Sequence, residues 1–159
     1  AAEAAARAAA AAAAAAANPG GGGGNPGGGN PGGGNSSGGW LVPARYGFIS
    51  TTFQQWWGHT GIDLASACWT PIIAPRSGTI SYIGYKDNIG GNMIHIDHGG
   101  GVQTRYAHLA GFASNWGQWV NQGQVVGYVG TTGMSTGCHL HYEVLVNGIF
   151  QNPLAGYFG

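Results

Sequence analysis

From Trp40 onward, short apolar runs rich in Val, Ile, Tyr and Thr alternate with turns rich in glycine and asparagine. This pattern is typical of strands joined by tight turns. No segment after residue 40 has helical periodicity, so we expect an all-β domain, built as a sandwich or a compact sheet. Glycines 99–101 suit a hairpin turn. The predicted strands cover residues 78–85, 92–99, 102–109, 124–130 and 139–148.

The first 39 residues have a different pattern. Residues 1–17 are alanine except for Glu3 and Arg7, and alanine is the strongest helix former. Residues 18–39 are almost entirely Asn, Pro, Gly and Ser, with Asn-Pro-Gly repeated three times, so they cannot bury apolar surface. We predict an Ala-rich helical segment, then a flexible linker or a polar binding tail. One functional domain follows over 40–159.

The chain of 159 residues has a formal net charge of zero, and only 6% of its residues are charged. No basic patch favours nucleic acid or an anionic membrane surface. No apolar stretch reaches the roughly 18 residues that span a bilayer, and the alanine run lacks the cationic start of a signal peptide. We therefore expect no nucleic-acid partner and no membrane span. Cys68 and Cys138 leave two buried thiols and one disulfide equally open.

Histidines and scarce carboxylates gather in three short segments. In "CHLHYE", His139 and His141 share one face of a strand, where they begin a metal site or lie on a solvated surface. In "GHTGID", His59 and Asp63 are suitable zinc ligands or make a local hydrogen bond. In "RYAHL", His108 stands near the end of a strand, where a packed core histidine is the alternative.

Taken together, the three segments supply more donors than a catalytic metal site needs. Catalytic zinc takes three protein ligands and leaves the fourth position to water. His59, Asp63 and one histidine of the His139/His141 pair provide three ligands. The remaining histidine of the pair and His108 can then move protons or stabilise charge, which is the composition of a metal hydrolase.

The segments "HTGID", "RYAHL" and "TGCHLHYEV", in this order and spacing, resemble the lysostaphin/LytM-type zinc metallo-endopeptidases. The resemblance covers residues 50–154 and includes connecting stretches such as "TPIIAPRSGTISYIG" and "VNGIFQNPL". It implies a compact, mainly antiparallel β domain with a substrate groove over the sheet, and one Zn2+ per domain. The zinc ligands it implies are His59, Asp63 and His141. The catalytic histidines it implies are His108 and His139.

By this resemblance, the chain is a hydrolase that cuts peptide bonds of bacterial peptidoglycan through a metal-activated water. The bond that it cuts lies in a stem-peptide cross-link or in a cross-bridge. Loops such as 84–91 and 110–119 determine which substrate is cut. The resemblance also implies an extracytoplasmic location, secreted, periplasmic or wall-associated. An unknown upstream region is expected beyond the linker. The alternatives are a non-catalytic peptidoglycan-binding or regulatory module and a structural envelope or phage-assembly domain.

The loop before the first ligand departs from the family pattern. Several members carry a tyrosine there, whereas this chain has Phe53, Trp56 and Trp57. Either the chain lacks that hydroxyl, or a distant residue such as Tyr46 supplies it. The loop is short, which predicts a low and open groove wall on which the tryptophans contact substrate or pack.

Two further features complete the expected site. Cys138 directly precedes His139, and the resemblance favours a Cys68–Cys138 disulfide that braces the metal site; the alternative is a free Cys138 lining it. His95 and His98 match no ligand or catalytic position of the family. We expect structural roles for both, with Asp97 serving the adjacent turn.

Overall fold

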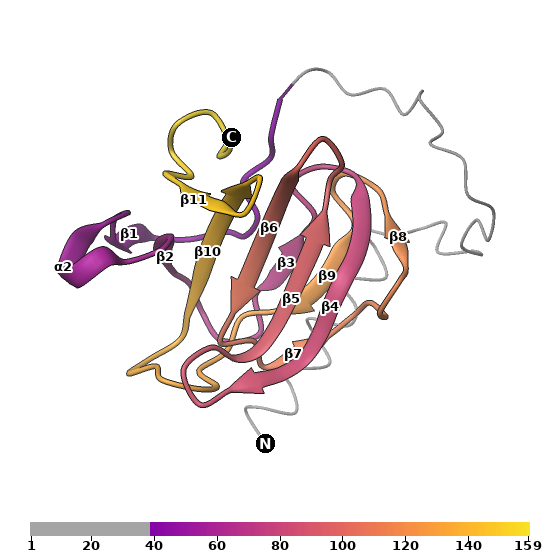
Figure 1. The fold of residues 1–159 in the computed structure, drawn as a ribbon. Helices are drawn as coiled ribbons and strands as arrows, with labels where there is room; N and C mark the ends of the chain where they lie inside the picture. Colours follow the sequence, from indigo (N-terminus) through magenta and orange to yellow (C-terminus); the bar gives the residue numbers. More distant parts are fainter. Residues whose placement is uncertain (1–38) are drawn as a thin grey trace.

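Figure 1 shows the computed structural model of the protein, which describes residues 39–159. The predicted helical segment at 1–17 and the linker at 18–39, Gly39 excepted, lie outside this part. Within the described part, no helix is long and apolar enough to cross a bilayer. The elements are β1 (Phe48–Thr51), α2 (Gln55–Gly58), β2 (Ile62–Ala65), β3 (Pro71–Ile73), β4 (Gly78–Asp87), β5 (Gly91–Asp97), β6 (Val102–Ala107), β7 (Gly111–Phe112), β8 (Trp119–Val120), β9 (Val125–Tyr128), β10 (His139–Val146) and β11 (Ile149–Gln151).

The strands form two antiparallel sheets. The larger sheet has the order β1-β2-β10-β6-β5-β4-β8, with β11 paired to β10, and the smaller has the order β3-β9-β7. The smaller sheet lies behind the larger one in the view of Figure 1. The all-β, mainly antiparallel prediction is confirmed, and all five predicted strands are present as β4, β5, β6, β9 and β10.

The sequence prediction missed the short strands. β1, β2, β3, β7, β8 and β11 have four residues or fewer, so each depends on its neighbours for pairing rather than on a pattern of its own. The one helical element within residues 39–159, α2, is a single irregular turn in which Trp56 and Trp57 adopt left-handed φ angles of 52° and 65°. The absence of helical periodicity after residue 40 therefore predicted the described structure well.

The core lies between the two sheets. Alternate side chains of β10, Leu140, Tyr142 and Val144, are fully buried, because successive residues of a strand point to opposite faces. Ile72 of β3 and Val126 of β9 belong to the same hydrophobic cluster, so the smaller sheet covers this face of the larger one. The opposite face of β2, β10 and β6 is therefore left open for polar side chains.

The two histidines outside the family motifs have structural positions. His95 is buried on β5, and its ring lies 4.9 Å from that of Tyr82, centroid to centroid. His98 donates from Nδ1 to the carbonyl of Ser77 at 2.9 Å, and its Nε2 lies 2.8 Å from the Thr104 hydroxyl. Because a carbonyl only accepts, the proton of His98 is on Nδ1, and Nε2 accepts from Thr104.

The turn after β5 also matches the prediction. The Asp97 carboxylate accepts a hydrogen bond from the backbone N–H of Gly99 at 2.9 Å. The carboxylate thereby closes the turn that leads into the hairpin between β5 and β6.

We expect the protein to lose stability as the pH falls from 6.5 towards 4. Burial lowers the pKa of His98 to about 4 from 6.5, so the unfolded chain binds more protons than the folded one in this interval. The contribution of neutral His98 to the free energy of unfolding is complete above pH 6.5 and is lost as the pH falls through the pKa of His98 in the folded protein. The loss amounts to about 3 kcal/mol. Urea unfolding at pH 7 and at pH 4.5 measures it.

The matched variant is His98→Gln, which removes the titrating ring. It should be less stable at pH 7, yet lose less stability on acidification than the unsubstituted protein. An equal loss in both proteins would show that His98 does not carry this pH dependence.

Candidate metal centre and substrate groove

The predicted ligands meet where β2 and β10 run side by side on the open face of the larger sheet. Asp63 of β2 is the strand partner of His141 on β10, although the two residues are 78 positions apart. The alternation that buries Leu140 and Tyr142 turns His141 to the opposite face. Strand register therefore brings the second and third predicted ligands together.

Gly61 allows the chain in front of β2 to reach this site. A Cβ atom at Gly61 would collide with the backbone carbonyl of Tyr142 on β10. Only glycine permits this close approach, and it carries His59 to a position beside Asp63. The close approach to Tyr142 thus explains why glycine occupies this position of "HTGID", which the sequence alone did not reveal.

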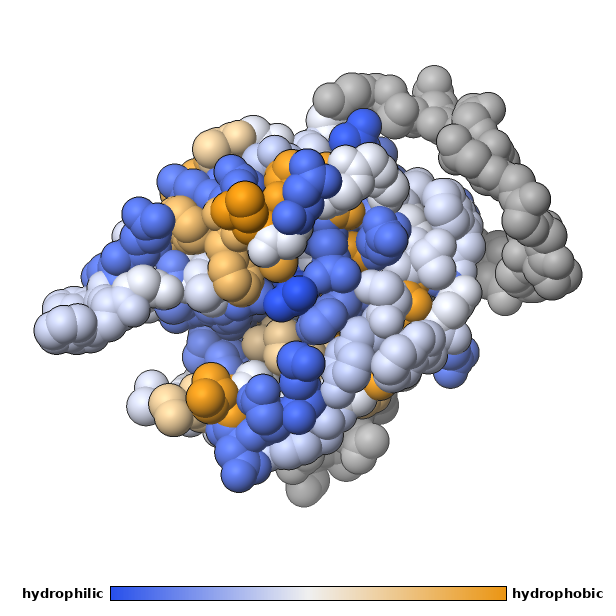
Figure 2. All heavy atoms as spheres, in the orientation of Figure 1, coloured by the Kyte–Doolittle hydropathy of each residue, from blue (hydrophilic) through white to orange (hydrophobic). Residues whose placement is uncertain are grey.

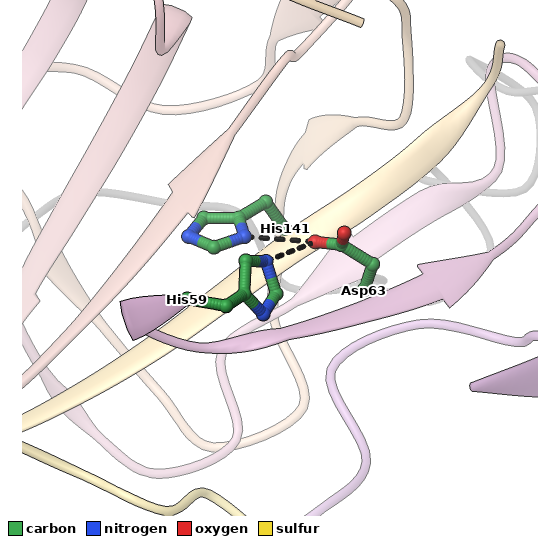
Figure 3. A group of neighbouring side chains, drawn as sticks. All are labelled: His59, Asp63 and His141. Carbon is green, nitrogen blue, oxygen red and sulfur yellow. Dashed lines mark hydrogen bonds and ion pairs between the residues drawn. The ribbon is translucent and has the colours of Figure 1, made fainter. Parts of the chain in front are cut away.

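Three potential metal-ligand atoms lie close together, as Figure 3 shows. Nε2 of His59 lies 3.1 Å from Oδ1 of Asp63, and Nδ1 of His141 lies 2.8 Å from the same oxygen. One ligand atom from each residue lies within 4.8 Å of the others. Two imidazole nitrogens and a carboxylate oxygen fit a catalytic zinc site, which keeps a fourth position for water.

The second nitrogen of each ligand ring is held by a protein oxygen. Nδ1 of His59 lies 3.0 Å from the carbonyl of Thr52, which can only accept, so the proton is on Nδ1 and Nε2 is free for a metal. Nε2 of His141 lies 3.0 Å from Oε1 of Glu143, which also accepts from the hydroxyl of Thr60. Such partners fix the ring orientation of metal-binding histidines.

Sequence reasoning missed Glu143 and Thr60. The signal for Glu143 was its position two residues after His141, which places both side chains on the same face of β10. Thr60 gave no such signal, because it contacts Glu143 across 83 residues.

The charges of the site depend on these contacts. Burial raises the pKa of Asp63, but hydrogen bonds and charge from His141 and His59 outweigh it and hold the pKa well below its usual range. Burial lowers the pKa of His141, whereas Asp63 and Glu143 raise it to about 9. His141 therefore carries a proton at neutral pH unless a metal ion displaces it.

His108 and His139 lie beside the ligand cluster. Their ring centroids are 4.7 Å apart, and Nε2 of His139 lies 3.8 Å from Oδ1 of Asp63. Nδ1 of His108 donates to the carbonyl of Thr132, and Nδ1 of His139 donates to that of Gly137, both at 2.9 Å. The neutral form of each ring therefore keeps Nε2 unprotonated.

The backbone at His108 corrects the predicted strand. β6 ends at Ala107 rather than at residue 109, and His108 adopts a left-handed φ of 64°. This conformation costs about 1 kcal/mol or more, and such residues cluster at functional sites. Burial lowers the pKa of His108 to about 4, so its ring is neutral at pH 7.

A groove with a volume of about 590 Å³ runs over the five predicted site residues. Residues 56–60 line one side, and the hairpin between β4 and β5 together with residues 134–136 lines the other. Figure 2 shows the hollow between the projecting α2 tip and the lower edge of the molecule. The predicted loop 84–91 thus contributes to the groove, loop 110–119 does not line it, and residues 134–136 were missed.

The positions of the aromatic residues near the groove decide between the alternatives that the sequence left open. Trp56 and Trp57 expose 73% and 102% of their reference surface, so they do not pack into the core. Tyr46 lines a second cavity and packs against Phe158, 5.6 Å between ring centroids. It is therefore not placed to supply a hydroxyl to the groove, and no tyrosine lines the groove within residues 39–159.

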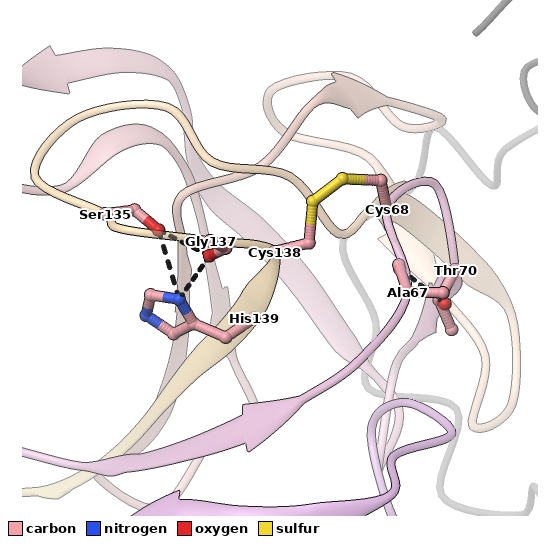
Figure 4. The surroundings of a disulfide bond; sticks show 7 residues. All are labelled: Ala67, Cys68, Thr70, Ser135, Gly137, Cys138 and His139. Atoms are coloured by element: carbon pink, nitrogen blue, oxygen red, sulfur yellow. Dashed lines mark hydrogen bonds between the residues drawn. A yellow bond between two sulfur atoms is a disulfide. The ribbon is translucent and has the colours of Figure 1, made fainter. Parts of the chain in front are cut away.

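Cys68 and Cys138 form a disulfide, as Figure 4 shows. The bond joins the segment after β2 to the start of β10, directly before His139. The alternative of a free Cys138 lining the site is therefore wrong. The disulfide ties together the two strands that carry Asp63 and His141.

Replacing both cysteines by serine should lower the free energy of unfolding by about 2–4 kcal/mol, because the bond closes a loop across 70 residues and restricts the unfolded chain. Urea unfolding of the double variant measures the loss. Reductant should destabilise the unsubstituted protein and leave the variant unchanged. Equal stability of the two proteins under oxidising conditions would contradict a stabilising bond.

The sequence pattern of Peptidase family M23 matches residues 57–153, which include all five predicted site residues. The chain belongs to peptidase family M23. This confirms the family inferred from the three motifs. The M23 domain is 42% identical over 123 residues to the DD-carboxypeptidase/endopeptidase Mpg of Neisseria meningitidis serogroup B, an alignment covering 72% of this chain and 28% of Mpg.

Solved structures agree with the family. A zinc-containing peptidase from Vibrio cholerae superposes on this M23 domain with a TM-score of 0.70 at 28% identity, covering 76% of this chain and 41% of that one. The antimicrobial peptidase lysostaphin from Staphylococcus simulans gives a TM-score of 0.63 at 31% identity, over 67% of this chain and 47% of lysostaphin. This chain thus spans less than half the length of each of these three proteins.

Proposed function

We propose that this M23 domain is a zinc-dependent endopeptidase that hydrolyses peptide bonds of bacterial peptidoglycan, in a stem-peptide cross-link or a cross-bridge. The observation that carries the proposal is the convergence of three metal-binding atoms, from His59, Asp63 and His141, in an open groove. The relative Mpg, named a DD-carboxypeptidase/endopeptidase, supports a substrate with D-amino acids. We assign the catalytic domain to residues 40–159.

Each side chain has a role that follows from its free atoms. Nε2 of His59, Oδ1 of Asp63 and Nδ1 of His141 would hold one zinc ion. When bound, zinc supplies a Lewis acid that acidifies water and polarises a carbonyl group. Nε2 of His108 or of His139 can accept the proton of the attacking water, since Nδ1 of each ring is already a donor to a carbonyl.

The same two histidines can also act after bond attack. Once one Nε2 has gained a proton, it becomes a donor that can pass this proton to the leaving amine. The other ring can stabilise the oxyanion that develops on the scissile carbonyl only in its doubly protonated form, in which Nε2 also carries a proton. Two adjacent rings, 4.7 Å apart, therefore supply the acceptor and the donor that amide hydrolysis needs.

The disulfide supports an extracytoplasmic location, because such bonds persist in oxidising compartments. Peptidoglycan is the proposed partner, together with the region that precedes the domain. A non-catalytic binding or regulatory module is the rival. The complete set of three candidate ligands and two adjacent histidines favours the enzyme.

The test measures zinc content of the purified full chain and digestion of peptidoglycan sacculi, with products mapped by mass spectrometry. We expect about one zinc ion per chain and release of peptides with new amino termini. Zinc without cleavage would favour the binding module. Absence of both bound zinc and released peptide would overturn the proposal that the domain is an enzyme.

A further inference from the structure

The groove holds an unusual share of the positive charge of the chain. Only five lysines and arginines occur in 159 residues, and two of them, Lys86 and Arg105, line the groove. Arg105 stands on β6 two residues before Ala107, the strand partner of the ligand His141. Two strand residues span about 7 Å, so Arg105 lies one side-chain position from the metal centre on the same face.

Neither cation forms a close ion pair with the described part of the protein, although Glu143, the strand partner of Arg105, and Asp87, next to Lys86, act on them at longer range. Within residues 39–159, no carboxylate forms an ion pair with Lys86 or Arg105. Nε of Arg105 donates to the side chain of Gln103 at 2.7 Å, and its guanidinium carbon lies 5.9 Å from the centre of the Phe150 ring. These contacts orient Arg105, and no described residue accepts a hydrogen bond from its terminal nitrogens.

Lys86 has a similar environment. Its ammonium nitrogen lies 5.1 Å from the centre of the Tyr82 ring, an attraction that supports the side chain without cancelling its charge. Lys86 falls in the irregular part of β4, between the paired residues Tyr85 and Asp87. The irregularity re-aims the side chain at the edge of the sheet, where it lines the groove.

The carboxylates of the groove already have other partners. Asp63 belongs to the metal centre, and Glu143 accepts from His141 and Thr60. Asp87 accepts from the backbone N–H of Gly90 at 2.7 Å and from that of Ile89 at 2.9 Å, inside its own turn. The terminal N–H groups of Arg105 and the ammonium of Lys86 therefore have no carboxylate hydrogen bonded to them within residues 39–159, which leaves them available for a negative group on a ligand.

Both cations act on the same end of the groove floor. Arg105 is the strand partner of His95 on β5, and His95 is buried. Burial, followed by the charges of Arg105 and Lys86, lowers the pKa of His95 to about 4. Both positive charges therefore act at His95, opposed by the Glu143 carboxylate, and the neutral His95 adds no third positive charge.

We propose that Arg105 and Lys86 form a carboxylate-binding subsite that selects stem-peptide cross-links over glycine bridges. The proposal rests on the proposed function. Stem peptides of peptidoglycan carry free carboxylates next to their cross-links, whereas an oligoglycine bridge carries none along its length. The guanidinium of Arg105 can bind a carboxylate through two parallel N–H groups, and Lys86 adds a point charge.

The test uses two synthetic cross-linked stem-peptide dimers, identical except that the carboxyl beside the cross-link is free in one and a carboxamide in the other. Pentaglycine is the neutral third substrate. With zinc-loaded full chain, kcat/KM for the carboxylate dimer should exceed that for the carboxamide dimer by about 10- to 100-fold, the range of charge-assisted hydrogen bonds. Pentaglycine should be the poorest substrate.

Arg105→Gln should remove most of this preference. It should lower kcat/KM for the carboxylate dimer by about 10-fold or more, mainly through KM, and leave the carboxamide dimer unchanged. Arg105→Lys should keep part of the preference, because it retains the charge and loses the paired N–H groups. Lys86→Gln should have a smaller effect, since its exposed ammonium is well solvated.

The matched control is Arg45→Gln, which removes an exposed arginine that lines the second cavity instead. Arg45→Gln should leave kcat/KM unchanged for both dimers. The zinc content should stay near one ion per chain in all variants. Equal rates for the two dimers with zinc bound would overturn the subsite and leave the endopeptidase intact. Cleavage of none of the three substrates would instead count against the proposed function. The substrate comparison on the unsubstituted protein decides the matter even if Arg105→Gln does not fold.

Discussion

Asp63→Asn will abolish zinc binding and lower peptidoglycan hydrolysis by about 1,000-fold or more, because a metal ion supplies several kcal/mol of transition-state stabilisation. Asp63 provides the oxygen that both ligand histidines face, at 3.1 Å and 2.8 Å. The carboxamide keeps the volume of the side chain and removes the negative charge that zinc requires. Elemental analysis of the purified variant, alongside release of soluble peptides from sacculi, measures both losses.

The matched control for this prediction is Asp97→Asn. Asp97 has the same charge as Asp63 but a different position, since it lies at the exposed end of β5 and closes a turn. Its variant should keep one zinc ion and full hydrolysis. A full zinc content in Asp63→Asn would show that Asp63 is not a ligand and that the zinc site consists of other residues.

His139→Ala and His108→Ala should each lower kcat by about 100- to 10,000-fold while the zinc content stays near one per chain, the range of general acid–base catalysis. The reason is that each ring directs Nε2 to the site with Nδ1 tied to a backbone carbonyl. Steady-state rates on a cross-linked peptide over a range of pH, with zinc analysis of each variant, measure the effect. The variant that lacks the base should lose the acidic limb of the kcat/KM profile.

His98→Gln serves as the control histidine, because His98 hydrogen-bonds to Ser77 and Thr104 away from the groove. At pH 7 it should hydrolyse peptide at the normal rate. Loss of zinc from His139→Ala or His108→Ala would make the affected histidine a ligand. Unchanged rates in both variants would remove the two histidines from the mechanism.

The long strands were predictable because their signal is local. β4, β5, β6 and β10 have six to ten residues, enough for β-branched and aromatic side chains and flanking glycines to identify each one. β2 has only four residues and supplies Asp63, yet nothing in "IDLA" separates it from a loop. It is a strand because β1 and β10 pair with it on both sides.

The amino-acid sequence by itself determined the all-β class and, through three motifs, which side chains are candidates for the metal and the proton transfers. Histidine and aspartate chemistry is a property of the residues and can be read without coordinates. Only the tertiary structure decided which of their atoms meet, that Glu143 and Thr60 hold His141, and that Tyr46 lies elsewhere. It also decided that no carboxylate of residues 39–159 forms a close ion pair with Arg105. These facts depend on strand register and packing between residues up to 83 positions apart, which no local pattern encodes.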